Sequence, residues 1–169
     1  EKLKEVVIPD GVTKINKRTF DQTPNMKKLT LPKNLQELSI EAFFGANGLE
    51  EIQIPEGITM LPEGSFGFCE ALNKVELPAS ITKIDKNAFQ DCPNLETVEM
   101  KEGLKHIAMY AFQNCKKLPD VKLPNSLETI ENEVFLNCTD MSGLKLGNGL
   151  KTIGEKAFFH SHGIESLDF

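Results

Sequence analysis

The sequence repeats itself every 23 residues, and this period limits the folds that the chain can adopt. Seven phenylalanines follow the period without a break: Phe20, Phe43, Phe66, Phe89, Phe112, Phe135 and Phe158. The four cysteines follow it as well: Cys69, Cys92, Cys115 and Cys138. A unit of this length cannot bury its apolar side chains alone, so successive copies must stack into an elongated solenoid.

Each repeat divides into two segments with different periodicity. The unit reads L-x-x-V-x-L-P-x-G-V-x-x-I-x-x-x-A-F-x-x-C-x-x, starting at Leu3. Alternating apolar residues at its start predict a short half-buried strand, which a proline ends in five of the repeats. A turn-favouring residue such as Gly11 or Ser80 follows. The spacing of Ala88, Phe89 and Cys92 is typical of a single helical turn.

These elements predict an α/β solenoid with parallel strands on its concave side and short extended or helical turns on its convex side. We expect a single domain over residues 1–169, with seven full repeats from Leu3 and the first strand of an eighth. Parallel strands lie about 4.8 Å apart, so the phenylalanines would form one internal column. Neither end shows a polar capping segment. We therefore expect the chain to be part of a longer array.

With its 23-residue length, the proline after the strand and the A-F-x-x-C ending, the unit resembles a leucine-rich repeat of the BspA-like (Treponema pallidum-type) class. Ordinary leucine-rich repeats place an asparagine where this chain has proline. The resemblance covers the chain from Leu3 to Phe169. It implies a right-handed leucine-rich-repeat solenoid from a bacterial cell-surface or secreted protein. The role implied is adhesion, with a host matrix protein or a bacterial surface protein as partner.

Charge and hydropathy disfavour two classes of partner. The formal net charge is −6, and the lysines and arginines form no basic stripe. Nucleic acids and anionic membranes both require clustered cations, so we expect the chain to bind neither. The longest apolar runs are only a few residues, which is too short to insert into a bilayer. No segment resembles a signal peptide, so an extracellular or cell-surface location rests on the resemblance alone.

No combination of residues in the sequence is typical of an enzyme. The three histidines (His106, His160 and His162) accompany no nucleophile, and there is no phosphate-binding loop. We expect no catalytic residue, cofactor or metal site. A metal at His160 and His162 would need further ligands, but the preceding repeat offers only Asn137 and Thr139. A solvated turn is the better interpretation of this histidine pair.

The position that holds the four cysteines carries small residues in other repeats, namely Thr23, Ala46 and Ser161. This pattern indicates a small, buried side chain, so we expect packed free thiols. Disulfides between adjacent repeats and a metal site remain alternatives.

The outward positions of the strands are the candidate binding surface, on the concave face. They comprise Lys28, Thr30, Glu51, Gln53, Lys74, Glu76, Thr97, Glu99, Asp120, Lys122 and Lys145. One interpretation is a ladder of alternating charges that helps the repeats to stack, with each exposed pair worth about 0–1 kcal/mol. The other is a polar docking surface for a protein. The face carries no aromatic residue, which counts against sugar binding there.

Four large apolar residues depart from the repeat: Phe44, Phe68, Leu136 and Phe159. They are expected to cover local gaps in the packing, with an exposed interface as the alternative.

The sequence thus predicts a non-enzymatic, protein-binding repeat scaffold. A structural spacer and a targeting region of a larger multidomain enzyme are the alternatives.

Overall fold

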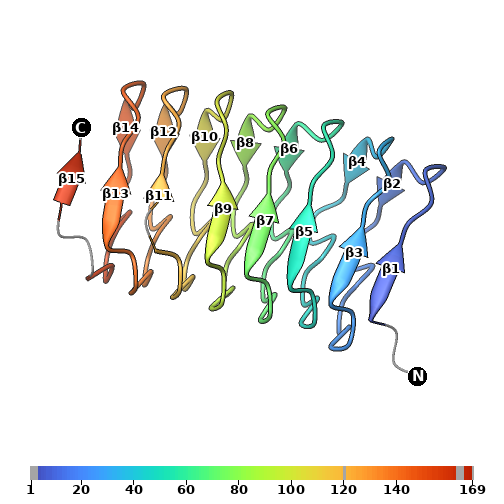
Figure 1. Cartoon of the computed structure of the whole chain (residues 1–169). Helices are drawn as coiled ribbons and strands as arrows, with labels where there is room; N and C mark the ends of the chain where they lie inside the picture. The colour runs from blue at the N-terminus through green and yellow to red at the C-terminus, as the bar shows by residue number, and fades with distance from the viewer. Residues whose placement is uncertain (1–3, 120, 163–165, 169) are drawn as a thin grey trace.

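The computed structural model describes residues 4–119, 121–162 and 166–168. The repeats stack side by side, with β1 (Glu5–Val7) and β15 (Ser166–Asp168) at opposite ends of the array (Figure 1). Each repeat contributes two short strands, and every strand pair is parallel. Equivalent residues of neighbouring repeats face each other, as in the pairing of Glu5 with Lys28. The predicted solenoid of 23-residue repeats is confirmed.

The first strand of each repeat belongs to the first ladder. Its strands are β1, β3 (Lys28–Thr30), β5 (Glu51–Gln53), β7 (Lys74–Glu76), β9 (Thr97–Glu99), β11 (Val121–Lys122), β13 (Gly143–Lys145) and β15. In β3, β5 and β7 the central residue is buried, as Leu29 and Ile52 are, while its neighbours point outward. This alternation follows from the two-residue period of a strand.

The second strand of each repeat belongs to the second ladder. Its strands are β2 (Lys14–Ile15), β4 (Glu37–Leu38), β6 (Met60–Leu61), β8 (Lys83–Ile84), β10 (His106–Ile107), β12 (Thr129–Ile130) and β14 (Thr152–Ile153). The predicted turn joins the two strands of a repeat: the Val12 N–H donates to the Pro9 carbonyl at 3.0 Å, and the Ile58 N–H donates to the Pro55 carbonyl at 3.2 Å.

The remaining side of the solenoid consists of turns. No residue in the described part of the chain is helical, so turns replace the helical turn expected around Phe89. The described residues therefore contain no helix long enough to cross a membrane. The Phe89 N–H donates to the carbonyl of Ala111 in the next repeat at 2.8 Å, while the Gln90 N–H donates to Asn87 in its own repeat at 3.1 Å. The backbone alternates between bonding the next repeat and closing its own turn.

This alternation requires two left-handed residues in each repeat, four positions apart. The pairs are Arg18 and Gln22, Glu41 and Gly45, Gly64 and Phe68, Asn87 and Asp91, Tyr110 and Asn114, Glu133 and Asn137, and Lys156 and His160. Only two of these residues are glycine, although a left-handed backbone disfavours most side chains. Hydrogen bonds between repeats therefore impose the conformation against local preference.

The phenylalanine column fills the interior. Adjacent rings along the seven phenylalanines are stacked, with centroids 4.8–5.7 Å apart and planes within 14° of parallel. The five middle rings are fully buried, whereas Phe20 and Phe158 at the two ends are partly buried. The repeats thus share one continuous core.

Two prolines, Pro62 and Pro119, lie outside the position that holds proline in most repeats, and each coincides with a break in one of the ladders. The first ladder is interrupted between β9 and β11, and the second between β4 and β6. Glu96 donates its N–H to the carbonyl of Asn73 at 2.9 Å, and its counterpart in the next repeat is Pro119. The Asp85 N–H donates to the carbonyl of Leu61 in the preceding repeat, and the residue equivalent to Asp85 one repeat earlier is Pro62. A proline lacks this donor, so pairing stops at each of these positions.

Candidate interaction surface

The outward side chains of the first ladder form one surface, which we call the strand face. The structure places ten of the eleven predicted contact residues there, and each is exposed or half-buried: Lys28, Thr30, Glu51, Gln53, Lys74, Glu76, Thr97, Glu99, Lys122 and Lys145. Asp120 lies outside the described residues. The structure brings the ten together in two rows, and their role in binding stays a prediction.

The strand face carries alternating charges in one row. Glu5, Lys28, Glu51 and Lys74 lie in register on adjacent strands, so opposite charges are neighbours. Among the described residues, however, the ion pair on this face lies within one strand: Lys74 Nζ is 2.7 Å from Glu76 Oε1. This hydrogen bond raises the pKa of Lys74 and lowers the pKa of Glu76. Both side chains are solvent-exposed, so the pair orients charges more than it stabilises the fold.

Ion pairs between successive repeats lie on other surfaces of the described chain. They include Lys14 with Glu37, Arg18 with Glu41, Lys27 with Glu50, and Lys151 with Glu128. The partners in each pair are 23 residues apart. Electrostatic support of the stack therefore comes mainly from outside the strand face, which weakens the interpretation of that face as a stacking ladder.

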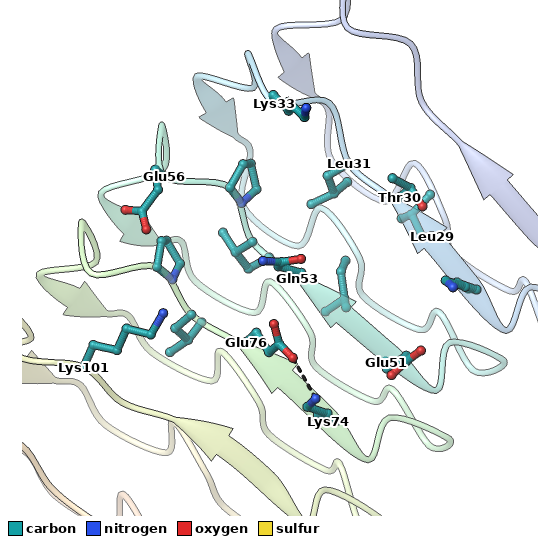
Figure 2. Close-up of a pocket in the computed structure, with 16 residues that line it drawn as sticks. Leu29, Thr30, Leu31, Lys33, Glu51, Gln53, Glu56, Lys74, Glu76 and Lys101 are labelled. Atoms are coloured by element: carbon teal, nitrogen blue, oxygen red, sulfur yellow. Dashed lines mark ion pairs between the residues drawn. The ribbon is translucent and has the colours of Figure 1, made fainter.

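The strand face is hollowed over β3, β5 and β7. The resulting strand-face groove has a volume of about 650 Å³. Its lining includes half-buried Pro55 and the largely buried residues Leu31 and Leu77. Its charged residues are Lys28, Lys33, Glu51, Glu56, Lys74, Glu76 and Lys101 (Figure 2). Lys101 takes the position that Pro55 and Pro78 hold in earlier repeats, and this adds a cation to the groove. The groove therefore offers charges of both signs beside apolar surface.

The four cysteines are free and buried, as expected for packed thiols. Each thiol donates a hydrogen bond to a phenylalanine carbonyl, as Cys69 Sγ does to Phe43 O at 3.1 Å. Ser161 Oγ makes the same bond to Phe135 O at 2.7 Å, which explains why serine can replace cysteine. Burial raises the pKa of Cys138 to about 12. Such thiols are poor nucleophiles and poor metal ligands.

The histidines lie in two separate environments. His160 Nδ1 lies 3.2 Å from His162 Nε2 on the surface. His106 Nε2 lies 2.7 Å from Glu131 Oε1, while Glu131 Oε2 accepts the Met109 N–H at 2.8 Å. Burial opposes ionisation of Glu131, but these hydrogen bonds outweigh it and lower its pKa. Within the described ranges, no three His, Cys, Asp or Glu residues are grouped to hold a metal ion.

The four off-repeat apolar residues behave differently from one another. Phe44 is half-buried and covers Gly67, because a Cβ atom on that glycine would lie 3.1 Å from the Phe44 ring. The gap-covering prediction is confirmed for Phe44. Phe68 and Phe159, however, remain 44% and 48% exposed, and Leu136 is half-buried. Packing gaps therefore do not account for Phe68 and Phe159.

A second groove, which was not expected from the sequence, lies on the side of the turns, and we call it the flank groove. It has a volume of about 700 Å³ and extends over four repeats. Its lining includes a row of residues at the same position in consecutive repeats: Phe68, Asp91, Asn114 and Asn137. Asn114 Nδ2 donates to Asp91 Oδ1 at 2.7 Å, and Asn137 Nδ2 donates to Asn114 Oδ1 at 2.8 Å. The 23-residue spacing of these polar residues was the available signal.

A stack of short parallel strands, tight turns and an internal apolar column defines a leucine-rich-repeat protein. The family model of the BspA type leucine rich repeat region matches residues 1–119 and 105–169, with six copies. The chain belongs to this family, which confirms the resemblance seen in its repeat unit.

Solved structures agree with this assignment. A leucine-rich repeat protein from Eubacterium ventriosum is 29% identical with a TM-score of 0.90, and the match covers 96% of this chain and 44% of that one. The T. pallidum leucine rich repeat protein is 26% identical with a TM-score of 0.79, covering 99% and 70%. The chain thus spans less than half of the first relative. No curated protein sequence matches the chain.

Proposed function

We propose that the chain is a non-enzymatic scaffold that binds a protein partner through its strand face. The observation that carries this proposal is the strand-face groove, where charges of both signs surround apolar surface on consecutive repeats. Protein interfaces combine these features, because charges set specificity while apolar burial supplies affinity. Leucine-rich repeats are in general protein-interaction modules, which agrees with this proposal.

The proposed setting is a bacterial cell surface or secretion, with adhesion as the role. A leucine rich cell surface protein from Faecalibacterium prausnitzii is 22% identical with a TM-score of 0.58, covering 99% of this chain and 61% of that one. The pneumococcal vaccine antigen PcpA is 22% identical with a TM-score of 0.57, covering 98% and 50%. These proteins share the fold, and their descriptions support a surface location. The proposed partners are host matrix proteins or bacterial surface proteins.

A structural spacer is the second candidate, and the continuous core favours it. The phenylalanine stack and the ion pairs between repeats, such as Lys14 with Glu37, join the repeats along the array. A spacer requires this stiffness but no binding surface, so altering the strand face would leave its function unchanged.

Charge inversion on the strand face separates the two candidates. Replacing Lys74 with Glu and Glu76 with Lys inverts both charges and still allows the two side chains to pair. The matched control is Lys14→Glu with Glu37→Lys, which inverts an ion pair on the second ladder. Binding is measured by surface plasmon resonance against purified collagen, laminin, fibronectin and fibrinogen, and against intact bacterial cells.

The strand-face inversion is expected to weaken binding to one of these targets at least tenfold, while the control binds like the wild type. Equal binding by all three proteins would contradict docking on the strand face. Absence of any binding, together with an unchanged melting temperature, would favour the spacer.

A further inference from the structure

The flank groove is built differently from the strand-face groove. Its lining contains two rows of equivalent positions. One row is Phe68, Asp91, Asn114 and Asn137, and the other, two positions further along each repeat, is Glu70, Pro93, Lys116 and Thr139. It follows the long axis of the solenoid across four repeats. An occupant of the flank groove would therefore meet equivalent protein positions at regular intervals.

Phe68 is unusual in this row, because a bulky aromatic residue occupies a left-handed, exposed position. Its φ is 59°, in the left-handed region, where a bulky side chain is disfavoured. Equivalent positions in the next repeats hold Asp91, Asn114 and Asn137, which tolerate this backbone. The Phe68 ring packs on Phe44 with centroids 5.2 Å apart, yet 44% of the residue is exposed. The strain thus presents an aromatic ring to the flank groove instead of burying it.

The three polar residues beside Phe68 form a ladder with spare hydrogen-bonding capacity. Asn114 and Asn137 each donate one amide hydrogen to the preceding member, at 2.7 and 2.8 Å. An amide nitrogen carries two hydrogens, and a carboxylate or amide oxygen can accept more than one bond. The side chains are half-buried, and their bonds to each other hold them in place. The ladder therefore offers oriented donors and acceptors, one set for each repeat.

The repeat spacing selects among possible occupants. Ring centroids in the neighbouring phenylalanine column advance by 5.1–5.3 Å per repeat through the middle of the array. An extended peptide advances about 3.3–3.4 Å per residue, which does not match this interval. A β-1,4-linked pyranose chain advances by a distance close to one repeat per ring. Each ring would then lie beside one repeat. Because successive β-1,4-linked rings are turned over relative to each other, equivalent hydroxyl or acetamido groups would face the ladder at every second repeat, while one ring face stacks on Phe68.

The charges of the flank groove agree with a neutral occupant. Two carboxylates, Glu70 and Asp91, line it against one lysine, Lys116. A phosphorylated or otherwise polyanionic ligand would be repelled, whereas a neutral glycan would not.

We propose that the flank groove binds a linear, neutral β-1,4-linked oligosaccharide along the solenoid axis. Phe68 is the stacking platform, and Asp91, Asn114 and Asn137 are the hydrogen-bonding residues. This site is separate from the strand face, so one chain carries a glycan site and a protein-docking surface on different sides.

The test titrates the full 169-residue chain with cellohexaose, chitohexaose and the corresponding disaccharides by isothermal calorimetry. The informative variant is Phe68→Asn, which installs the residue found at the same position in two later repeats and so relieves backbone strain. Its matched control is Phe159→Gln, because Phe159 is comparably exposed but does not line the flank groove, and glutamine occupies its position in two other repeats. Asn114→Ala removes the centre of the ladder.

At least one hexasaccharide is expected to bind more tightly than its disaccharide. Phe68→Asn is expected to weaken this binding by about threefold to tenfold, since it removes one aromatic contact, while its melting temperature stays equal or rises. Asn114→Ala should weaken binding as well, and Phe159→Gln should not. The proposal is overturned if no hexasaccharide binds the wild type, or if Phe68→Asn binds as tightly as the wild type. Loss of protein capture by Phe68→Asn with unchanged oligosaccharide binding would identify a protein contact and also overturn it.

Discussion

The phenylalanine column makes a quantitative prediction about how the repeats are coupled. Phe89 is fully buried and stacks on Phe112, with ring centroids 5.1 Å apart and an interplanar angle of 14°. A stacked aromatic pair contributes about 0.5–1.5 kcal/mol beyond the burial of its surface. Replacing both residues with leucine, singly and together, isolates this term from the loss of buried area, because the area terms cancel in a double-mutant cycle.

The expected coupling free energy between Phe89 and Phe112 is therefore about 0.5–1.5 kcal/mol. The control cycle uses Phe43 and Phe112, which are both fully buried and have no stacking partner in common. Distant residues without a shared partner usually behave additively to within about 0.3–0.5 kcal/mol. Each single Phe→Leu variant should still unfold at a lower urea concentration than the wild type, because the fully buried ring leaves a gap.

Urea unfolding followed by far-ultraviolet circular dichroism measures these free energies, since the chain has no tryptophan to report fluorescence. The slope of the free energy with urea must stay constant across the variants for the cycle to be read as one transition. A coupling of Phe89 with Phe112 no larger than that of Phe43 with Phe112 would refute direct stacking as a source of stability.

Three other predictions concern the thiols, a ladder break and a left-handed position. The pKa of Cys138 is about 12 in the folded chain against 9.0 unperturbed, so its contribution to stability is constant below pH 9 and falls as the pH rises from 9 to 12. Urea unfolding at pH 8 and pH 10 should therefore show a smaller loss of stability for Cys138→Ala than for the wild type, and an equal loss would contradict the assignment. Replacing Pro119 with Glu supplies the missing N–H donor. This should slow amide hydrogen exchange in β9 and β11 and add about 0.5–1.5 kcal/mol of stability. Equal exchange rates in the variant and the wild type would show that the proline does not cause the break in the first ladder. Glu133→Asn should stabilise the chain by up to about 1 kcal/mol, because asparagine tolerates its φ of 55° better than glutamate. Glu63→Asn, at a position outside the left-handed set, should bring no gain in thermal unfolding, and an equal gain would refute the backbone argument.

Positions at which the side chain makes the same contacts in every repeat could be predicted from the sequence. The burial of Phe89, the outward direction of Lys28 and Glu51, and the turn after Pro55 all follow from a pattern that recurs each 23 residues. Such positions are predictable because identical units in parallel register must place equivalent residues side by side. The strand face could be assigned for the same reason.

Positions whose contacts are specific to particular repeats could be predicted less well from the sequence. One interpretation placed Lys74 in a charge ladder between adjacent strands, yet its ion pair is with Glu76 on the same strand. Phe68 looked like a gap filler, yet it is exposed on a left-handed backbone. Side-chain reach and backbone conformation decide these cases, and a one-letter pattern contains neither.

The period, the solenoid and the residues of the core column follow from the amino-acid sequence, because apolar side chains that recur at one interval can be buried only by stacking. The tertiary structure alone revealed the left-handed turns, the ladder breaks at Pro62 and Pro119, and the flank groove. These features depend on hydrogen bonds between one repeat and the next. Their geometry exists only after the repeats have stacked, so no single repeat specifies it.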